Sequence, residues 1–398
     1  MENKKKGCGC FKYLFFLVVI IFVVTQLVNN GLFASKTPAS EIDDISVDDR
    51  FYYAQLNTTE KTVYRALLQT AQNGDLTCRL SEVDYDTYVA ATNRAAVALS
   101  LDHPELFWLN GGWTANGTRG FDSNSDTITI QLGAYAFWDY VSAPQKYIDI
   151  FESAVNAVVA QAEKYTNVYD RVEFVHDYIA HNAYYDYDRL EEAKKTMHVA
   201  SSEYIYSAYS CLVQKATVCA GYAKAFQVIM QRLGYNCTYV RGDAGGAHAW
   251  NYIELDDQGY FLDVTWDDAD WRTDSGAVRY PNDAKYDYFC ITKRELNKTH
   301  IEDESLFNIP DPTATKYNYY VYNHYRVQTY NFQTVAAILD DQRDKSVICV
   351  QFSSLEQMNK AKADLFDKGK WSRVPSLKGR KISYITDKDH LSFTILKK

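Results

Sequence analysis

The sequence predicts an α+β protein whose core is one long amphipathic helix packed on an antiparallel sheet. Over 217–233 apolar residues return at helical spacing along one face, and Gly234 ends the pattern. Over 248–266 two alternating segments flank a polar turn, which predicts a β-hairpin. The pattern changes on either side of this core. It predicts a mixed α/β region before the core and a small α/β domain after it.

The composition is that of a folded, acidic protein. The chain has 398 residues, of which 47% are hydrophobic and 23% are charged, so it is globular rather than disordered. This length suits two or three domains. The net charge of −9 and the lack of a basic patch argue against nucleic acid as a partner. The sequence contains no glycine-rich phosphate loop, and we expect no cofactor.

Residues 1–34 have the pattern of an export segment. Lysines in 1–12 precede an unbroken apolar run, and the stretch 13–34 is just long enough to span a bilayer as a transmembrane helix. Because a small-x-small cleavage site is missing, we expect a signal anchor. A cleaved signal peptide and a buried helix are the alternatives. With the lysines in the cytoplasm, the rest of the chain is predicted to be extracellular, either anchored in the cell membrane by a single pass or secreted.

The exported part is predicted to consist of a linker and three folded regions. The polar and acidic stretch 35–50 is the linker. The mixed α/β region covers 51–144, the central domain 145–300 and the small C-terminal domain 310–398. These boundaries follow the changes in residue pattern, such as the one after Pro312.

Shorter patterns assign elements within these regions. Residues 57–60 have the pattern of a helix cap with a capping box, and 126–132 alternate like a strand. Helix faces are predicted at 145–165 and 170–179, followed by a tyrosine-rich loop at 182–188. In the C-terminal domain we expect both element types. They are strands at 318–329, 346–352, 381–386 and 391–396, and helices at 333–339 and 354–368.

The cysteines do not predict a disulfide framework. Six of them follow the export segment at irregular spacing, and no C-x-x-C pair occurs. We therefore expect buried free thiols and no structural zinc. Glu173 and His176, with Asp177 and His181, superficially suggest a metal site. The two histidines are five residues apart, however, and we interpret this stretch as a solvated helix face.

Cys219 lies in the first turn of the helix predicted over 217–233. The unpaired N–H groups and the helix dipole favour negative charge there, and hence the thiolate. The backbone N–H of Cys219 is also suited to stabilise an oxyanion. Considered alone, a cysteine at this position is more often a small buried apolar residue.

The predicted hairpin brings a histidine and an aspartate onto one face. His248 opens the first strand, and Asp263 lies in the second, which we expect over 260–266. With a two-residue turn at 256–257, Trp250 pairs with Asp263, and His248 is the diagonal neighbour of Asp263. A slip of one residue in the register would place the two side chains on opposite faces.

These three residues suit nucleophilic catalysis. A thiol is mostly protonated near neutral pH, and His248 can accept that proton and later return it to the leaving group. Asp263 can fix the orientation and tautomer of the imidazole. We therefore expect Cys219, His248 and Asp263 to converge as a catalytic triad.

The motifs around the triad resemble the transglutaminase-like superfamily of papain-fold cysteine enzymes in order and spacing. The resemblance covers roughly 145–300. It is stronger to exported, membrane- or wall-associated proteins of Gram-positive bacteria than to animal cross-linking enzymes. It implies a papain-like core with Cys219 as nucleophile, His248 as base and Asp263 as orienting acid. The matching motifs are Val218–Ala223, His248–Asn251 and Leu262–Trp266, with Tyr184–Asp186 and Tyr288–Phe289 as weaker matches.

We therefore expect an exported cysteine enzyme that acts on peptide or side-chain amide bonds through a thioester. Hydrolysis is favoured over amine transfer, as in a protease or amidase, because an exported site is rich in water. The expected substrate is a protein or a cell-wall peptide. One alternative is a non-catalytic surface module that binds peptide or glycan in an aromatic cleft. Another is a structural wall-assembly protein.

Overall fold

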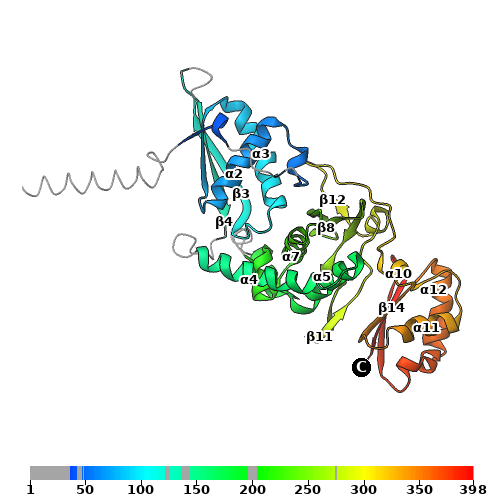
Figure 1. Ribbon diagram of the computed structural model, residues 1–398. Coiled ribbons are helices and arrows are strands. Elements are labelled where there is room, and N and C mark those ends of the chain that lie inside the picture. Colours follow the sequence, from blue (N-terminus) through cyan, green and yellow to red (C-terminus); the bar gives the residue numbers. More distant parts are fainter. Residues whose placement is uncertain are drawn as a thin grey trace, which may run out of the picture.

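The computed structural model describes residues 36–42, 47, 49–121, 126–135, 144–195, 204–273 and 276–397. Three parts, each built on a four-stranded sheet, follow one another along the chain (Figure 1). The predicted membrane anchor at 13–34 lies outside the described residues. Among the described residues, no helix has the length and apolar character needed to cross a membrane.

The N-terminal part is a mixed sheet on which two helices pack. The predicted capping box is present: Asn57 Oδ1 accepts from the Glu60 N–H at 3.0 Å, and Glu60 Oε2 accepts from the Asn57 N–H at 2.9 Å. The strand expected at 126–132 is also present. The sheet order is β1-β2-β4-β3. The elements are β1 (Thr37–Pro38), α2 (Thr58–Gln72), β2 (Thr77–Val83), α3 (Tyr85–Asp102), β3 (Leu109–Thr118) and β4 (Asp126–Ala134).

In the central part the long helix α7 packs on the antiparallel sheet β12-β7-β8-β9 (Figure 1). Helices α4 and α5 pack against α7, and the predictions of these three helices are confirmed. The main elements are α4 (Pro144–Ala162), α5 (Val168–Asn182), α7 (Cys219–Arg232), β7 (Cys237–Asp243), β8 (Ala247–Leu255), β9 (Gln258–Leu262), α9 (Lys293–Leu296) and β12 (Ile301–Glu302). Four short elements and a hairpin complete it: β5 (Tyr184–Tyr185), α6 (Tyr187–Lys195), β6 (Ala216–Thr217), α8 (Val264–Asp267), β10 (Asp268–Thr273) and β11 (Gly276–Ala284).

The hairpin β8–β9 has the predicted register but a shorter second strand. Leu255 pairs with Gln258, as expected for a turn at 256–257. The prediction of strand as far as Trp266 was wrong, because β9 ends at Leu262. The side chain of Asp263 accepts hydrogen bonds from the N–H groups of Thr265 and Trp266, so it caps the short helix α8 instead of continuing the strand.

Gly221 allows α7 to approach the loop before it. A methyl group at Gly221 would overlap the hydroxyl of Thr217 and lie 2.8 Å from the carbonyl oxygen of Ser207. Alanine inside a helix normally stabilises it by about 1 kcal/mol relative to glycine. At this position we expect Gly221→Ala to lower the free energy of unfolding by about 1–3 kcal/mol instead, because the core becomes overpacked. Denaturant unfolding measures the change, and an increase in stability would contradict the packing described here.

The C-terminal part has a sheet of order β13-β14-β16-β15. Most of its predicted elements are present, but the strand expected over 318–329 is reduced to the two residues of β13, and its first half is the helix α10. Asn318 caps a short helix, and both Tyr319 and Tyr320 are fully buried, which a strand with one covered face does not allow. The elements are α10 (Tyr319–Tyr322), β13 (Arg326–Val327), α11 (Phe332–Asp341), β14 (Val347–Phe352), α12 (Leu355–Lys362), β15 (Ile382–Asp387) and β16 (Ser392–Lys397).

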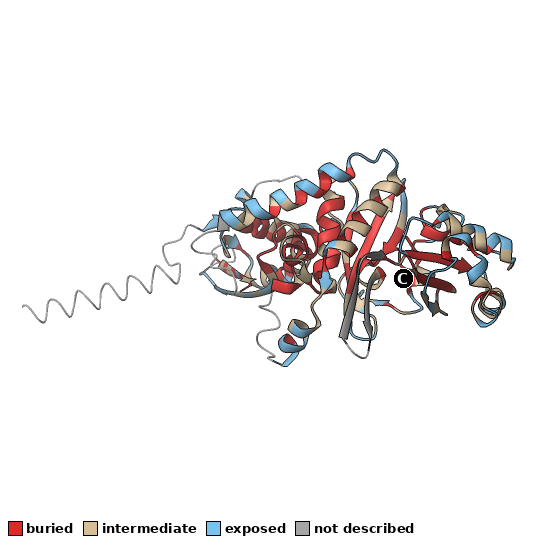
Figure 2. Cartoon of the chain, turned by 90° about the horizontal axis from the view of Figure 1, so that it is seen from below, coloured by how far each residue is buried: buried red, intermediate tan, exposed pale blue. Residues whose placement is uncertain are grey.

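One hydrophobic cluster continues through all three parts, and Figure 2 shows buried residues running through the middle of the molecule. It contains Leu67 from the N-terminal part, Phe226 from α7 and Cys349 from β14. Ile348 and Val350, on the other face of β14, belong to a second cluster with α11 and α12. The six cysteines that the structure describes are free thiols, as predicted, and all but Cys219 are buried.

Candidate active site

Cys219 is the first residue of α7. The residue before it, Val218, is extended and gives no side-chain cap. The positive end of the helix dipole therefore lies near the thiol without a capping side chain, while the N–H of Gly221 donates to the carbonyl of Val218 at 2.8 Å. Cys219 is partly exposed, unlike the other cysteines that the structure describes, and it lines two hollows on the surface. A reagent or substrate can therefore reach its sulfur.

The structure brings the predicted histidine and aspartate together beside this thiol. His248, near the start of β8, has its Nε2 atom 2.7 Å from Oδ2 of Asp263. Because Nε2 is occupied by the carboxylate, Nδ1 is left for the thiol of Cys219, which is close enough to His248 to contribute to its raised pKa. The side chain of His248 is 9% exposed and that of Asp263 is 1% exposed, so their hydrogen bond is shielded from water.

The charges of these groups support one another. Burial disfavours the imidazolium of His248, but the carboxylate of Asp263 outweighs it and raises the pKa of His248 to about 10. Burial also opposes the charge of Asp263. The charge and hydrogen bonds of His248, with those of His300, nevertheless hold the pKa of Asp263 well below its usual range. The arrangement therefore favours a charged imidazole facing a charged carboxylate.

Asp263 has more partners than the sequence indicated. Oδ1 accepts from the N–H groups of Thr265 at 2.9 Å and Trp266 at 3.2 Å. Oδ2 is shared by His248 and by a second imidazole, His300, whose Nε2 lies 3.1 Å away. Sequence analysis missed His300 because it stands alone, far from the recognised motifs. No spacing rule connects it to Asp263.

A second donor lies beside the thiol. Strand β5 pairs in parallel with β6, and this pairing sets Tyr185 opposite Thr217, two residues before the nucleophile. The Tyr185 hydroxyl interacts with both the side chain and the backbone of Cys219. Burial, followed by the negative charge of the Cys219 thiolate, raises the pKa of Tyr185. The hydroxyl thus stays protonated and can donate to an oxyanion together with the Cys219 N–H. The weak tyrosine motif at 184–186 was the signal for this residue.

Two hollows meet at Cys219. One, of about 650 Å³, is lined by Tyr206, Tyr239 and Arg241 together with acidic residues such as Asp303. Arg241 pairs with Asp303 at 2.9 Å, so this hollow has an ion pair among its lining residues. The other, of about 630 Å³, is lined by Tyr185, Tyr187, Leu190 and Trp266 and is more aromatic. An extended ligand can therefore lie across the thiol of Cys219, with one hollow on each side of it.

His248, Asp263 and His300 also form the group in the described part of the chain that could hold a metal ion, with ligand atoms within 4.8 Å of one another. Both imidazoles already point a nitrogen at the same carboxylate oxygen, where their N–H groups are hydrogen-bond donors. Hydrogen bonding alone satisfies this cluster. A cation would have to displace both protons.

The interpretation of 173–181 as a solvated helix face was wrong for His176. This residue is fully buried and forms ion pairs with Asp177 at 2.9 Å and with Asp267 at 3.3 Å. Burial opposes the charge of the imidazole, but the hydrogen bond to Asp177 and the nearby carboxylate of Asp267 raise the pKa of His176 to about 9. Asp267 also accepts from the N–H of Tyr288, so the network anchors the segment behind the candidate site.

Comparisons with known proteins give one family match and two distant structural likenesses. A comparison with curated protein sequences gives no match. The chain resembles the crystal structure of a TGase (14% identity, TM-score 0.28), covering 58% of this chain and 59% of that one. It also resembles a candidate cysteine protease from Cytophaga hutchinsonii (14% identity, TM-score 0.24), covering 39% of this chain and 63% of that one. The family model of the transglutaminase-like superfamily matches residues 156–264, and this central part of the chain belongs to that superfamily.

Proposed function

We propose that the protein is a cysteine-dependent enzyme that transfers the acyl group of a peptide or side-chain amide through a thioester on Cys219. The observation that supports this proposal is that the partly exposed thiol of Cys219 lies beside His248, whose Nε2 is hydrogen-bonded to the buried carboxylate of Asp263. A nucleophile, a base and a group that orients the base are the parts that such chemistry requires.

In this proposal His248 takes the proton of the Cys219 thiol, and the sulfur attacks the carbonyl carbon of the amide. The oxyanion that forms accepts hydrogen bonds from the Cys219 N–H and from the Tyr185 hydroxyl. The C–N bond then breaks as the His248 imidazolium protonates the leaving amine, and a thioester remains. His248 next removes a proton from water, which attacks the thioester, releases a carboxylic acid and regenerates the thiol.

We propose hydrolysis, as in a protease or amidase, rather than transfer to an amine. The two hollows beside Cys219 are open, so water reaches the thioester. The proposed substrate is a protein or a cell-wall peptide outside the cell. The proposed location is the cell membrane, through a single pass at 13–34, with secretion as the outcome if that segment is cleaved.

A mass-spectrometric assay tests this proposal. The full chain is incubated with a peptide library, with and without a primary amine, beside the Cys219→Ala variant. Cleaved or deamidated products that depend on Cys219 are expected, and amine-linked products would instead indicate transamidation. Absence of any product and of any covalent acyl-enzyme would contradict the proposal. Binding of peptide without turnover would then favour a non-catalytic surface module.

A further inference from the structure

We propose that His300 is a positioning residue of this site, which holds the carboxylate of Asp263 in place for His248. The inference rests on the proposed function, and it adds a fourth polar side chain to the three that the motifs indicate. His300 directly precedes β12, and no atom of it is exposed to solvent. It therefore acts through Asp263 and does not itself contact a substrate.

The first argument is that both imidazoles share one oxygen. Oδ2 of Asp263 lies 2.7 Å from Nε2 of His248 and 3.1 Å from Nε2 of His300. The other oxygen, Oδ1, is bonded to two backbone N–H groups. With donors on both oxygens the carboxylate cannot rotate without breaking hydrogen bonds in a buried site, which is costly. His300 thus directs Oδ2 at His248.

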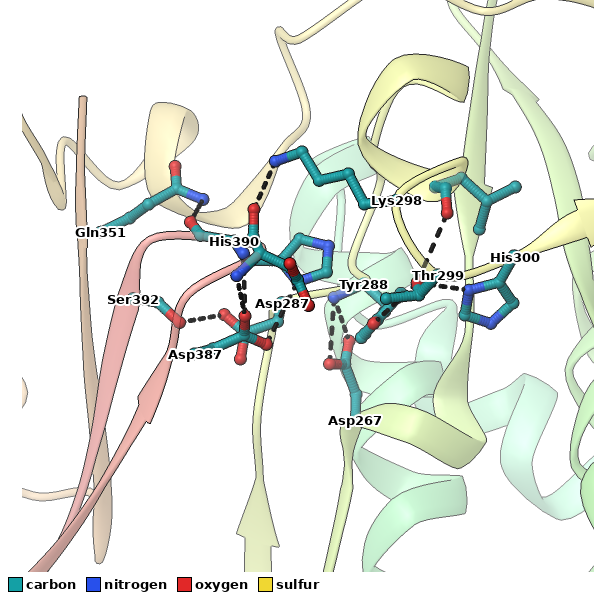
Figure 3. Close-up of polar contacts among 12 residues, drawn as sticks. Asp267, Asp287, Tyr288, Lys298, Thr299, His300, Gln351, Asp387, His390 and Ser392 are labelled. Atoms are coloured by element: carbon teal, nitrogen blue, oxygen red, sulfur yellow. Dashed lines mark hydrogen bonds and ion pairs between the residues drawn. The ribbon is translucent and has the colours of Figure 1, made fainter. Parts of the chain in front are cut away.

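The second argument is that the other ring nitrogen of His300 also has a partner, because Nδ1 contacts Thr299 (Figure 3). Oγ1 of Thr299 lies 2.8 Å from Nδ1 of His300, and the hydroxyl of Tyr288 lies 3.0 Å from the same Oγ1. The ionised carboxylate of Asp263 can only accept, so Nε2 of His300 carries a proton and donates to it, and Nδ1 can accept from the hydroxyl of Thr299. His300 thus keeps its Nε2 proton as a donor to Asp263, in contrast to His248, which must exchange a proton during the reaction.

The third argument is that aromatic rings hold the imidazole of His300 on several sides. Its ring centroid lies 4.8 Å from that of Trp250, 4.6 Å from that of Trp266 and 5.2 Å from that of Tyr288. The ring of Tyr288 in turn packs against His390 of the C-terminal part, with centroids 4.5 Å apart (Figure 3). The C-terminal part thereby supports the residues that orient Asp263.

Two substitutions separate positioning from simple packing. Leucine at position 300 removes the donor but keeps a buried side chain of similar size. Glutamine carries an N–H donor near the position of Nε2. Without the donor, the ionised form of Asp263 is less stable, so the pKa of Asp263 rises. As the pH is lowered, the imidazolium–thiolate pair is then lost at a higher pH than in the wild type. His103→Leu is the matched control, because His103 is also buried but lies in the N-terminal part.

The experiment follows alkylation of Cys219 by iodoacetamide against pH in the full chain, read by mass spectrometry of the peptide that contains Cys219. With His300→Leu we expect the rate at neutral pH to fall about tenfold to hundredfold and the acid limb to move up by about one pH unit. For His300→Gln we expect an alkylation rate within about threefold of the wild type, because the glutamine N–H still donates to the carboxylate of Asp263. His103→Leu should leave the profile unchanged.

Two outcomes would overturn the role of His300. One is a His300→Leu profile equal to that of the wild type. The other is equal impairment of the leucine and glutamine variants together with a lower melting temperature, which would indicate packing alone. Failure of the proposed function has a different signature. In that case wild-type Cys219 would react no faster than Cys219 in His248→Ala, and the role of His300 would end with it.

Discussion

Replacing Cys219 with alanine is expected to abolish turnover of peptide and amide substrates, with a loss of about 10⁴-fold or more in kcat. The reason is that no other thiol in the described part of the chain can substitute: the remaining five are buried, and Cys219 alone lines the hollows beside His248. Any residual rate would come from the oxyanion donors and from substrate binding. The measurement is product formation by mass spectrometry under substrate saturation.

Cys78→Ala is the matched control for this variant. Cys78 is a buried free thiol in β2 of the N-terminal part, far in sequence from the site. We expect this control to retain the wild-type rate, so that loss of activity reports position 219 and not the removal of a thiol. If Cys219→Ala kept more than about a tenth of the activity, a thioester on this residue could not be the main route.

Asp263→Asn has the second largest expected effect, a loss of about 10³- to 10⁴-fold in kcat. Asparagine keeps the size of the side chain but replaces a charged acceptor by a neutral amide. If its NH₂ group faces Nε2 of His248, the imidazole must accept there and carry its proton on Nδ1, where it can no longer take the proton of Cys219. Substrate binding is expected to change less than kcat, because Asp263 is buried and lines neither hollow.

The same variant should shift the pH profile in a defined direction. The carboxylate of Asp263 overcomes the effect of burial and raises the pKa of His248 to about 10. Without that charge the imidazolium loses its proton at a lower pH, so the alkaline limb of kcat/KM should move down. An alkaline limb that stayed in place in Asp263→Asn would contradict the charge pairing between these two residues. Asp267→Asn, behind the site, serves as the comparison for loss of a buried carboxylate.

Much of the site was predictable because strand pairing has strict rules. The alternation over 248–255 and the polar turn after it determine which residues face each other, and the observed register follows. The capping role of Asp263 was not predictable from alternation. An aspartate can end a strand by binding the N–H groups that follow it, and the sequence 263–266 reads equally well as strand.

Contacts between segments that are distant in the chain could not be predicted from the sequence. His300 meets Asp263 across 37 positions, and Tyr185 meets Cys219 only because β5 pairs with β6. Neither contact follows from a local period. His176 was misjudged for the same reason. The helical pattern predicts the face on which His176 lies. The carboxylate of Asp267, which stabilises the buried imidazole of His176, comes from a segment more than ninety residues away.

The packing on the two faces of β14 determines whether the C-terminal part can be removed from the protein. Val347 and Cys349 pack with the central part, whereas Ile348 and Val350 pack under α11 and α12. The C-terminal part, coloured orange to red in Figure 1, therefore covers the central core as well as its own. A fragment cut after residue 310 would present bare aromatic and aliphatic surface to water and should precipitate. Anyone isolating the enzyme for crystallisation should keep the last eighty-odd residues attached.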